Sequence, residues 1–241
     1  MLQNYKNGQI YVFLSPHIDD IAFSISGSLR RIIQKNTSYL VNIFSNTNYY
    51  VSNFDLKSIS VGVQRKTEDK LFIKRFKLKP IYLDHDDSSV LGHTSVSELI
   101  CSHKDFRNNM VRNSLINIFN IIKPDIVFCP LAIGGHIDHR MLKDELVNII
   151  EICKKVYFYE DLPYSCEYKP TDLLSIINKT FPFDLFPEEI DISNNWLEKK
   201  ECISFYESQL DKNTINLIKD YATKFHKNSL VERFWRYENK Q

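Results

Sequence analysis

Residues 10–20 read IYVFLSPHIDD, and this stretch decides the fold. Residues 10–14 are apolar and rich in β-branched and aromatic side chains, which is typical of a short strand buried on both faces. His17, Asp19 and Asp20 follow directly, and a segment with helical spacing of apolar residues begins at Asp20. A buried strand that ends in polar side chains and leads into a helix indicates an open α/β sheet, in which sites lie beyond the carboxyl ends of the strands.

The alternation of apolar runs and helical segments continues over the first two thirds of the chain. Further strands are predicted over residues 39–44, 80–83, 125–130 and 156–159, and helices over residues 20–34, 61–76, 107–122 and 139–153. This β-α-β order implies right-handed crossovers and a mostly parallel sheet flanked by helices. The sequence therefore predicts the α/β class.

The pattern changes after Asp161. Residues 162–195 are rich in Pro and Phe and are predicted to form loops that wall a pocket. Helices are predicted over residues 196–210 and around 231–237. Because no repeat or linker separates these parts, we expect a single domain over residues 1–241, with an α/β core over 1–161 and the loops and helices over 162–241.

Composition narrows the range of partners and compartments. The chain has 31 Lys and Arg against 30 Asp and Glu, so its formal charge of +1 provides no general field to attract nucleic acid or anionic lipid. The polar N-terminus does not resemble a signal peptide, and no apolar run is long enough to form a membrane span. The five cysteines are scattered and form no CxxC pair, which argues against disulfides or a thiolate zinc site. We expect a cytoplasmic protein without an integral membrane segment.

A second polar cluster follows the strand predicted over residues 125–130. Residues 134–140 read GGHIDHR, so another strand end offers His and Asp side chains. Taken alone, a His near a strand end is usually structural, and an Asp at a helix start is usually a cap. Together the two clusters supply three ligands for a catalytic metal ion and a further carboxylate to serve as a general base.

The two clusters resemble the PHPDDE and HPDH signatures of the PIG-L (LmbE-like) N-deacetylase family. The stretch YFYEDLPY, residues 157–164, also resembles the segment after a later strand in bacterial members. Family members are zinc enzymes with a Rossmann-like fold, so the resemblance implies that fold and a deacetylase activity here. The first signature departs from the family pattern, because Ile18 and Ile21 replace its usual Pro and Glu.

Carried over residue by residue, the resemblance implies a zinc ion held by His17, Asp20 and His139. Asp19 would be the general base that accepts the proton of the attacking water. His136 would stabilise the oxyanion and protonate the leaving amine. The same donor set also accepts iron(II), so the sequence leaves the native metal open.

The resemblance also implies supporting roles. Asp138 would hold an imidazole in orientation, as outer carboxylates do at metal sites. Arg65, Asp87 and Glu160 are predicted to contact the substrate, and Asp161 could bind a hydroxyl beside Glu160. For Arg65 a solvated helical charge is the alternative, and for the acidic residues it is a loop cap.

The function implied is a zinc-dependent hydrolase that removes an acetyl group from the nitrogen of an amino sugar, free or attached to a nucleotide, lipid or antibiotic. Two alternatives stay open: a non-catalytic sugar-binding protein with a silent metal site, and a metal-dependent hydrolase of another N-acyl substrate. The sequence fixes neither the sugar nor the oligomeric state.

Overall fold

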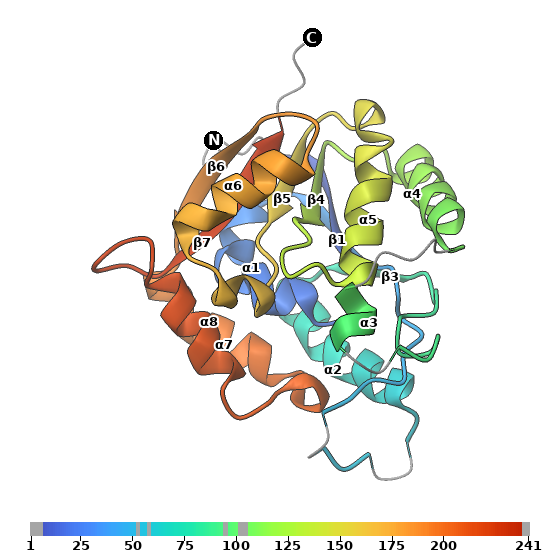
Figure 1. Ribbon diagram of the computed structural model, residues 1–241, viewed down its shortest axis with the longest axis horizontal. Coiled ribbons are helices and arrows are strands. Elements are labelled where there is room, and N and C mark those ends of the chain that lie inside the picture. Colours follow the sequence, from blue (N-terminus) through green and yellow to red (C-terminus); the bar gives the residue numbers. More distant parts are fainter. Residues whose placement is uncertain (1–6, 52–53, 57–58, 94–95, 101–105, 238–241) are drawn as a thin grey trace.

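The computed structural model describes residues 7–51, 54–56, 59–93, 96–100 and 106–237 and has one central seven-stranded sheet (Figure 1). The strand order is β3-β2-β1-β4-β5-β7-β6. The first five strands are parallel to one another, and the last two pair antiparallel. Their bounds are β1 Ile10–Ser15, β2 Thr37–Asn42, β3 Lys79–Tyr82, β4 Ile126–Pro130, β5 Val156–Tyr159, β6 Leu185–Asp191 and β7 Val231–Tyr237.

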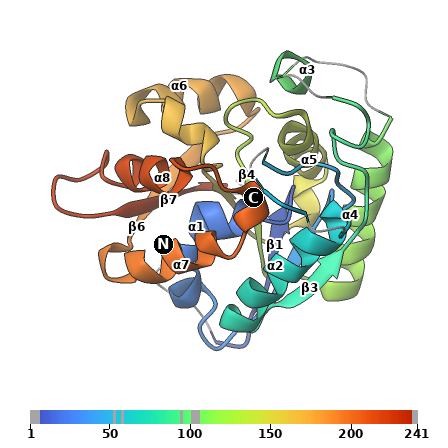
Figure 2. The same ribbon diagram turned by 90° about the horizontal axis from the view of Figure 1, so that it is seen from below.

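Helices cover both faces of the sheet (Figures 1 and 2). One layer contains α1, α2 and α7, and the other contains α4, α5 and α6. The α-helices are α1 Asp20–Ile32, α2 Val61–Phe76, α3 Val96–Ile100, α4 Asn108–Ile122, α5 Ile137–Val147, α6 Pro170–Thr180, α7 Trp196–Ser204 and α8 Thr214–Ala222. Four short 3₁₀ helices are η1 Ile150–Ile152, η2 Tyr164–Glu167, η3 Ser193–Asn195 and η4 Glu207–Gln209. Among the described residues, no helix is long and apolar enough to cross a membrane.

Aromatic stacking holds the central strands in register. Phe128 of β4 stacks between Phe13 of β1 and Tyr157 of β5, with ring centroids 4.5 and 5.5 Å apart, and all three side chains are fully buried. These residues are also direct neighbours in the two parallel ladders. Because a slip in register would turn these rings away from the core, the stack keeps the carboxyl ends of the three strands at one edge of the sheet.

The predicted α/β class and mostly parallel sheet are confirmed, and α2 and β5 have the predicted bounds. The helix predicted around Val231–Tyr237 is wrong, because this segment is strand β7. It pairs with β5 on one side and with β6 on the other. The backbone hydrogen bonds of two neighbouring strands override the local sequence pattern there. The preceding Pro- and Phe-rich segment was predicted as loops, but it also contains α6 and β6.

The C-terminal segment packs directly against α1, the helix that begins at Asp20. The carboxylate of Glu232 in β7 accepts hydrogen bonds from the backbone N–H groups of Gly27 and Ser28, at 2.9 and 2.8 Å. Lys199 of α7 forms a buried ion pair with Glu232 at 2.6 Å and donates to the Ser24 carbonyl. These contacts fix the middle of α1 against the C-terminal segment, and thereby the position of its first residue, Asp20.

Candidate metal centre and active site

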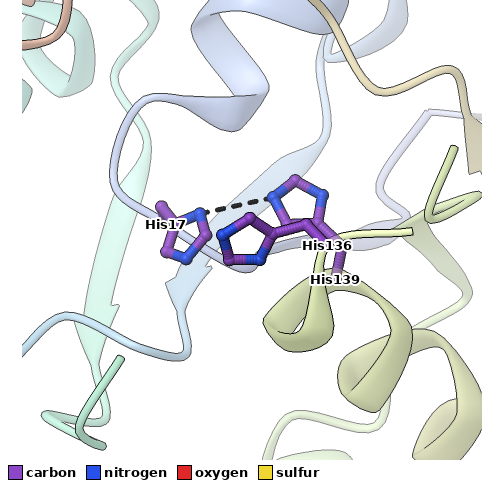
Figure 3. A group of neighbouring side chains, drawn as sticks. All are labelled: His17, His136 and His139. Atoms are coloured by element: carbon purple, nitrogen blue, oxygen red, sulfur yellow. Dashed lines mark hydrogen bonds between the residues drawn. The ribbon is translucent and has the colours of Figure 1, made fainter. Parts of the chain in front are cut away.

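Two loops at the carboxyl edge of the sheet bring three histidines together (Figure 3). His17 lies in the loop between β1 and α1, whereas His136 is the N-cap residue of α5 and His139 lies in its first turn. Each imidazole offers a nitrogen, and the three nitrogens lie within 4.8 Å of one another. His17 Nδ1 and His139 Nε2 are 3.3 Å apart.

The two carboxylate oxygens of Asp20 lie beside His17 and His139. Its Oδ1 lies 3.4 Å from His139 Nε2, and its Oδ2 lies 3.5 Å from His17 Nδ1. Ligands bonded to a tetrahedral zinc ion at about 2.0–2.1 Å stand about 3.3 Å from one another. The separations of His17, Asp20 and His139 match that spacing, and two imidazoles with one carboxylate suit a borderline divalent ion. These three residues therefore fit a metal ion.

The electrostatic environment of His139 also favours a cation. This side chain is fully buried, and burial alone would lower the pKa of its imidazole. The carboxylates of Asp20 and Asp161 outweigh that effect and raise the pKa of His139 to about 9. A negative potential strong enough to hold a proton on a buried imidazole also attracts a metal cation to the same place.

Each of these two imidazoles has a carboxylate on its other nitrogen. His17 Nε2 lies 3.0 Å from Asp138 Oδ2, and His139 Nδ1 lies 2.6 Å from Asp161 Oδ1. Such contacts orient a ligand imidazole and direct its remaining lone pair at the metal. Asp138 thus lies where the orienting role predicted for it requires. From the sequence, Asp161 is expected only as a contact to hydroxyls. It follows β5, and the pairing of β5 with β4 brings it to the same edge of the sheet as His139.

A buried arginine, which the sequence interpretation missed, supports Asp138. Arg107 precedes α4 and is fully buried, and its Nη1 lies 2.9 Å from Asp138 Oδ1. The backbone N–H of Ser88 donates to Asp138 Oδ2 at 3.0 Å. Burial alone would raise the pKa of Asp138, but His17 and the positive charge of Arg107 hold it well below its usual range. Asp138 is therefore a fixed anion behind His17.

Arg65 of α2 reaches the candidate base. Its Nη2 forms an ion pair with Asp19 Oδ1, and its Nη1 donates to Thr47 Oγ1 at 3.5 Å. The Arg65 side chain is only 3% exposed, while that of Asp19 is 14% exposed and so remains accessible. Arg65 thus holds the Asp19 carboxylate in place. The substrate contact predicted for Arg65 stays a prediction.

His136 lies beside this centre as a neutral hydrogen-bonding group. The backbone N–H of Asp138 donates to His136 Nδ1 at 3.2 Å, which leaves the imidazole proton on Nε2. Burial, with the charges of His17 and His139, lowers the pKa of His136 well below its usual value. At neutral pH, His136 therefore presents an N–H donor rather than an imidazolium.

The other two predicted substrate contacts already have partners in the protein. Asp87 Oδ1 accepts hydrogen bonds from Ser89 Oγ and the backbone N–H of Val90, which is a turn cap. Glu160 is buried, and its carboxylate accepts hydrogen bonds from Tyr221, Arg233 and Trp235 of the C-terminal segment. Their roles in substrate binding stay predictions.

The chain is similar in sequence and in fold to known deacetylases. The chain is 24% identical over 205 residues to 2'-N-acetylparomamine deacetylase of Streptomyces fradiae, covering 83% of this chain and 73% of the relative. Its fold matches the zinc-inhibited form of teicoplanin deacetylase Orf2, with a TM-score of 0.70, 16% identity and coverage of 94% and 97% of the two chains.

The fold also matches the N,N'-diacetylchitobiose deacetylase of Pyrococcus horikoshii, with a TM-score of 0.68, 18% identity and coverage of 98% and 87%. The family model described as "PIG-L: GlcNAc-PI de-N-acetylase" matches residues 12–150, which include both polar clusters and more than half of the chain. The chain therefore belongs to the PIG-L family of deacetylases.

Proposed function

We propose that this protein is a zinc-dependent hydrolase that releases acetate from the nitrogen of an N-acetylated amino sugar. The observation that carries the proposal is the convergence of His17, Asp20 and His139 at separations of 3.3–3.5 Å. Asp19 and His136, the residues that the chemistry requires, lie at the same edge of the sheet. A carboxylate base and a neutral N–H donor beside three metal ligands are the parts needed to hydrolyse an amide.

His17, Asp20 and His139 would hold a divalent metal ion. Such an ion would supply Lewis acidity, which would polarise an amide carbonyl and make a water molecule acidic enough to attack at neutral pH. Asp138 and Asp161 keep the two imidazoles aimed at it. Side chains of the protein carry out the proton transfers and stabilise the charge on the carbonyl oxygen.

Asp19 accepts a proton from the water molecule that attacks the acetyl carbonyl carbon. Arg65 keeps the Asp19 carboxylate in position during this step. His136 Nε2–H donates a hydrogen bond to the carbonyl oxygen as negative charge develops on it. Asp19 then returns its proton to the nitrogen, the carbon–nitrogen bond breaks, and the products are acetate and a free amine. We assign this proton to Asp19 because the pKa of His136 is lowered.

The relatives support an amino sugar that is part of a larger molecule. The curated relative acts on an acetylated paromamine, and the two solved structures belong to deacetylases of teicoplanin and of diacetylchitobiose. We propose a small or medium-sized conjugate of this type as the substrate of the present chain. The cytoplasmic location stays a prediction from the sequence.

The test is acetate release by the purified protein, with zinc and iron(II) supplied in parallel. The substrates are 2'-N-acetylparomamine, N,N'-diacetylchitobiose, N-acetylglucosamine and an N-acetyl amino acid. We expect release from at least one sugar and none from the amino acid. Asp19→Asn should lower kcat by about 10²–10⁴-fold, because the proton acceptor is lost. The exposed Asp172 provides the matched control, Asp172→Asn, which should retain full activity.

The alternatives predict different results. A non-catalytic sugar-binding protein would bind these sugars and release no acetate with either metal. A hydrolase of other N-acyl substrates would prefer the amino acid. Full turnover by Asp19→Asn would show that this residue is not the base.

A further inference from the structure

Tyr164 lies against the metal centre, although neither the predicted nor the proposed mechanism uses it. It begins η2, at the end of the YFYEDLPY segment. Its ring packs edge-on against His139 with centroids 5.3 Å apart, and it lies 6.0 Å from the ring of His136. One metal ligand and the candidate oxyanion donor thus share this tyrosine as a neighbour.

The backbone of the second cluster makes room for this ring. Gly134 has a φ of +83°, and a Cβ atom at this position would come within 2.8 Å of Tyr164 Cβ and 3.2 Å of its ring. Such distances are not tolerated between carbon atoms, so only glycine allows Tyr164 to pack this closely. The backbone N–H of Ser165 donates to the Asp161 carbonyl at 2.8 Å, which fixes the chain directly after Tyr164.

The hydroxyl of Tyr164 is available for a ligand. Within the described part of the chain it has no hydrogen-bond partner, whereas the hydroxyls of Tyr159, Tyr206 and Tyr221 bond to Leu14, Asp69 and Glu160 respectively. A tyrosine hydroxyl has an ordinary pKa of about 10, so it keeps its proton at neutral pH and can donate a hydrogen bond.

On the basis of the proposed function, we infer that Tyr164 is a further catalytic residue, whose hydroxyl donates a hydrogen bond to the acyl oxygen as that oxygen becomes an oxyanion. Its ring lies next to both the candidate oxyanion donor His136 and the candidate metal ligand His139, so we assign its hydroxyl and His136 Nε2–H to the same acyl oxygen. A donor of this kind acts mainly on the transition state, because the charge on the oxygen develops there. No proton is transferred to or from Tyr164.

The test compares the wild type with Tyr164→Phe and with the control Tyr168→Phe in the same segment. For each protein we would measure kcat, KM, bound zinc and melting temperature. We would also measure the affinity for a methylphosphonamidate of the amino sugar, which imitates the tetrahedral intermediate, and for the free amine product. Tyr164→Phe should lower kcat by about 100- to 1000-fold with KM changed less than about 2-fold, as expected for one lost oxyanion donor.

Further measurements distinguish a residue that donates to the oxyanion from one that only packs against the site. Tyr164→Phe should lose affinity for the phosphonamidate by the same factor as kcat/KM, while its affinity for the amine product, its zinc content and its melting temperature stay at wild-type values. Gly134→Ala, which displaces the ring, should reduce phosphonamidate affinity in the same direction. Tyr168→Phe should match the wild type in every measurement.

Wild-type kcat in Tyr164→Phe would overturn the inference, and so would a change in KM alone. If Tyr164→Phe folds poorly, unchanged phosphonamidate affinity in Gly134→Ala would overturn it instead. These outcomes differ from failure of the proposed function, in which the wild type itself releases no acetate from any sugar.

Discussion

His17 Nε2 contacts Asp138 Oδ2 at 3.0 Å, which leaves Nδ1 as the nitrogen that faces His139 and Asp20. The negative charge of Asp138 thus lies behind one metal ligand, and Arg107 holds that charge in place. This arrangement links the loop before α4 to the metal centre through two buried side chains. Metal binding should therefore depend on residues that do not touch the metal.

Asp138→Asn should weaken zinc binding by about 10–100-fold, because an amide neither carries the charge nor orients the imidazole as well. Competition with a chromogenic chelator measures the affinity. Asp144→Asn, on the same helix but 55% exposed, should bind zinc as the wild type does. Equal affinities in the two variants would contradict the orienting role.

Removal of the metal should abolish activity and also lower stability. His17 and His139 come from different loops, and an ion bound only by the folded protein adds about 2.7 kcal/mol when present at 100 times its Kd. We expect the chelated protein to melt at a lower temperature and to regain both stability and activity with zinc. His226→Ala, which alters an exposed histidine paired with Glu189, should respond as the wild type does. A melting temperature independent of chelation would contradict a metal bridge between the loops.

Gly27→Ala should destabilise the fold by about 1–3 kcal/mol, although alanine normally favours a helix. An added Cβ would come within 2.8 Å of Ile192 Cδ1 and 2.9 Å of Glu232 Oε1, and so would disturb the buried carboxylate that binds α1. Gly62→Ala is the matched control, because the nearest atom to its added Cβ would be the Ser45 carbonyl oxygen at 4.0 Å. Urea unfolding of both variants measures the difference. Equal stability would show that α1 tolerates the extra volume.

Protonation of the buried Asp69 carboxyl should raise the free energy of unfolding as the pH falls from 7 to 5. Burial raises the pKa of Asp69 to about 6, despite hydrogen bonds from Tyr82, Tyr206 and Asn42. The unfolded chain releases this proton near pH 4, so the folded state binds more protons between pH 4 and 6. The stabilisation is full below pH 4 and is lost as the pH rises through 6.

Relative to Asp69→Asn, the wild type should therefore gain about 1 kcal/mol in free energy of unfolding between pH 7 and pH 5. Other carboxylates titrate in both proteins and cancel in this difference. Parallel stability curves for the two proteins would mean that Asp69 titrates as an ordinary surface carboxyl.

Much of this architecture follows from local sequence. Short apolar runs predict the five parallel strands, because a strand buried on both faces has no polar side to display. Parallel strands bring their carboxyl ends to one edge, so the clusters around His17 and His139 were expected to meet. These predictions rest on periodicity and on topology, both of which are visible in the chain itself.

Contacts between individual side chains cannot be predicted from periodicity or topology. The pairing of β7 with β5 depends on a free sheet edge that only the folded core provides. Arg65 pairs with Asp19, and nothing in the local sequence of α2 predicts this partner. Arg107 and Tyr164 likewise reach the site from segments whose own pattern indicates only a helix start and a turn.

The central claim is that one ion is held by His17, Asp20 and His139. Anomalous diffraction at the zinc edge, from crystals grown with stoichiometric zinc, tests it most directly. The account predicts one strong peak at bonding distance from His17 Nδ1, His139 Nε2 and the Asp20 carboxylate, with His136 unbonded. A peak bonded to His136 in place of Asp20, or peaks only elsewhere on the protein, would contradict it.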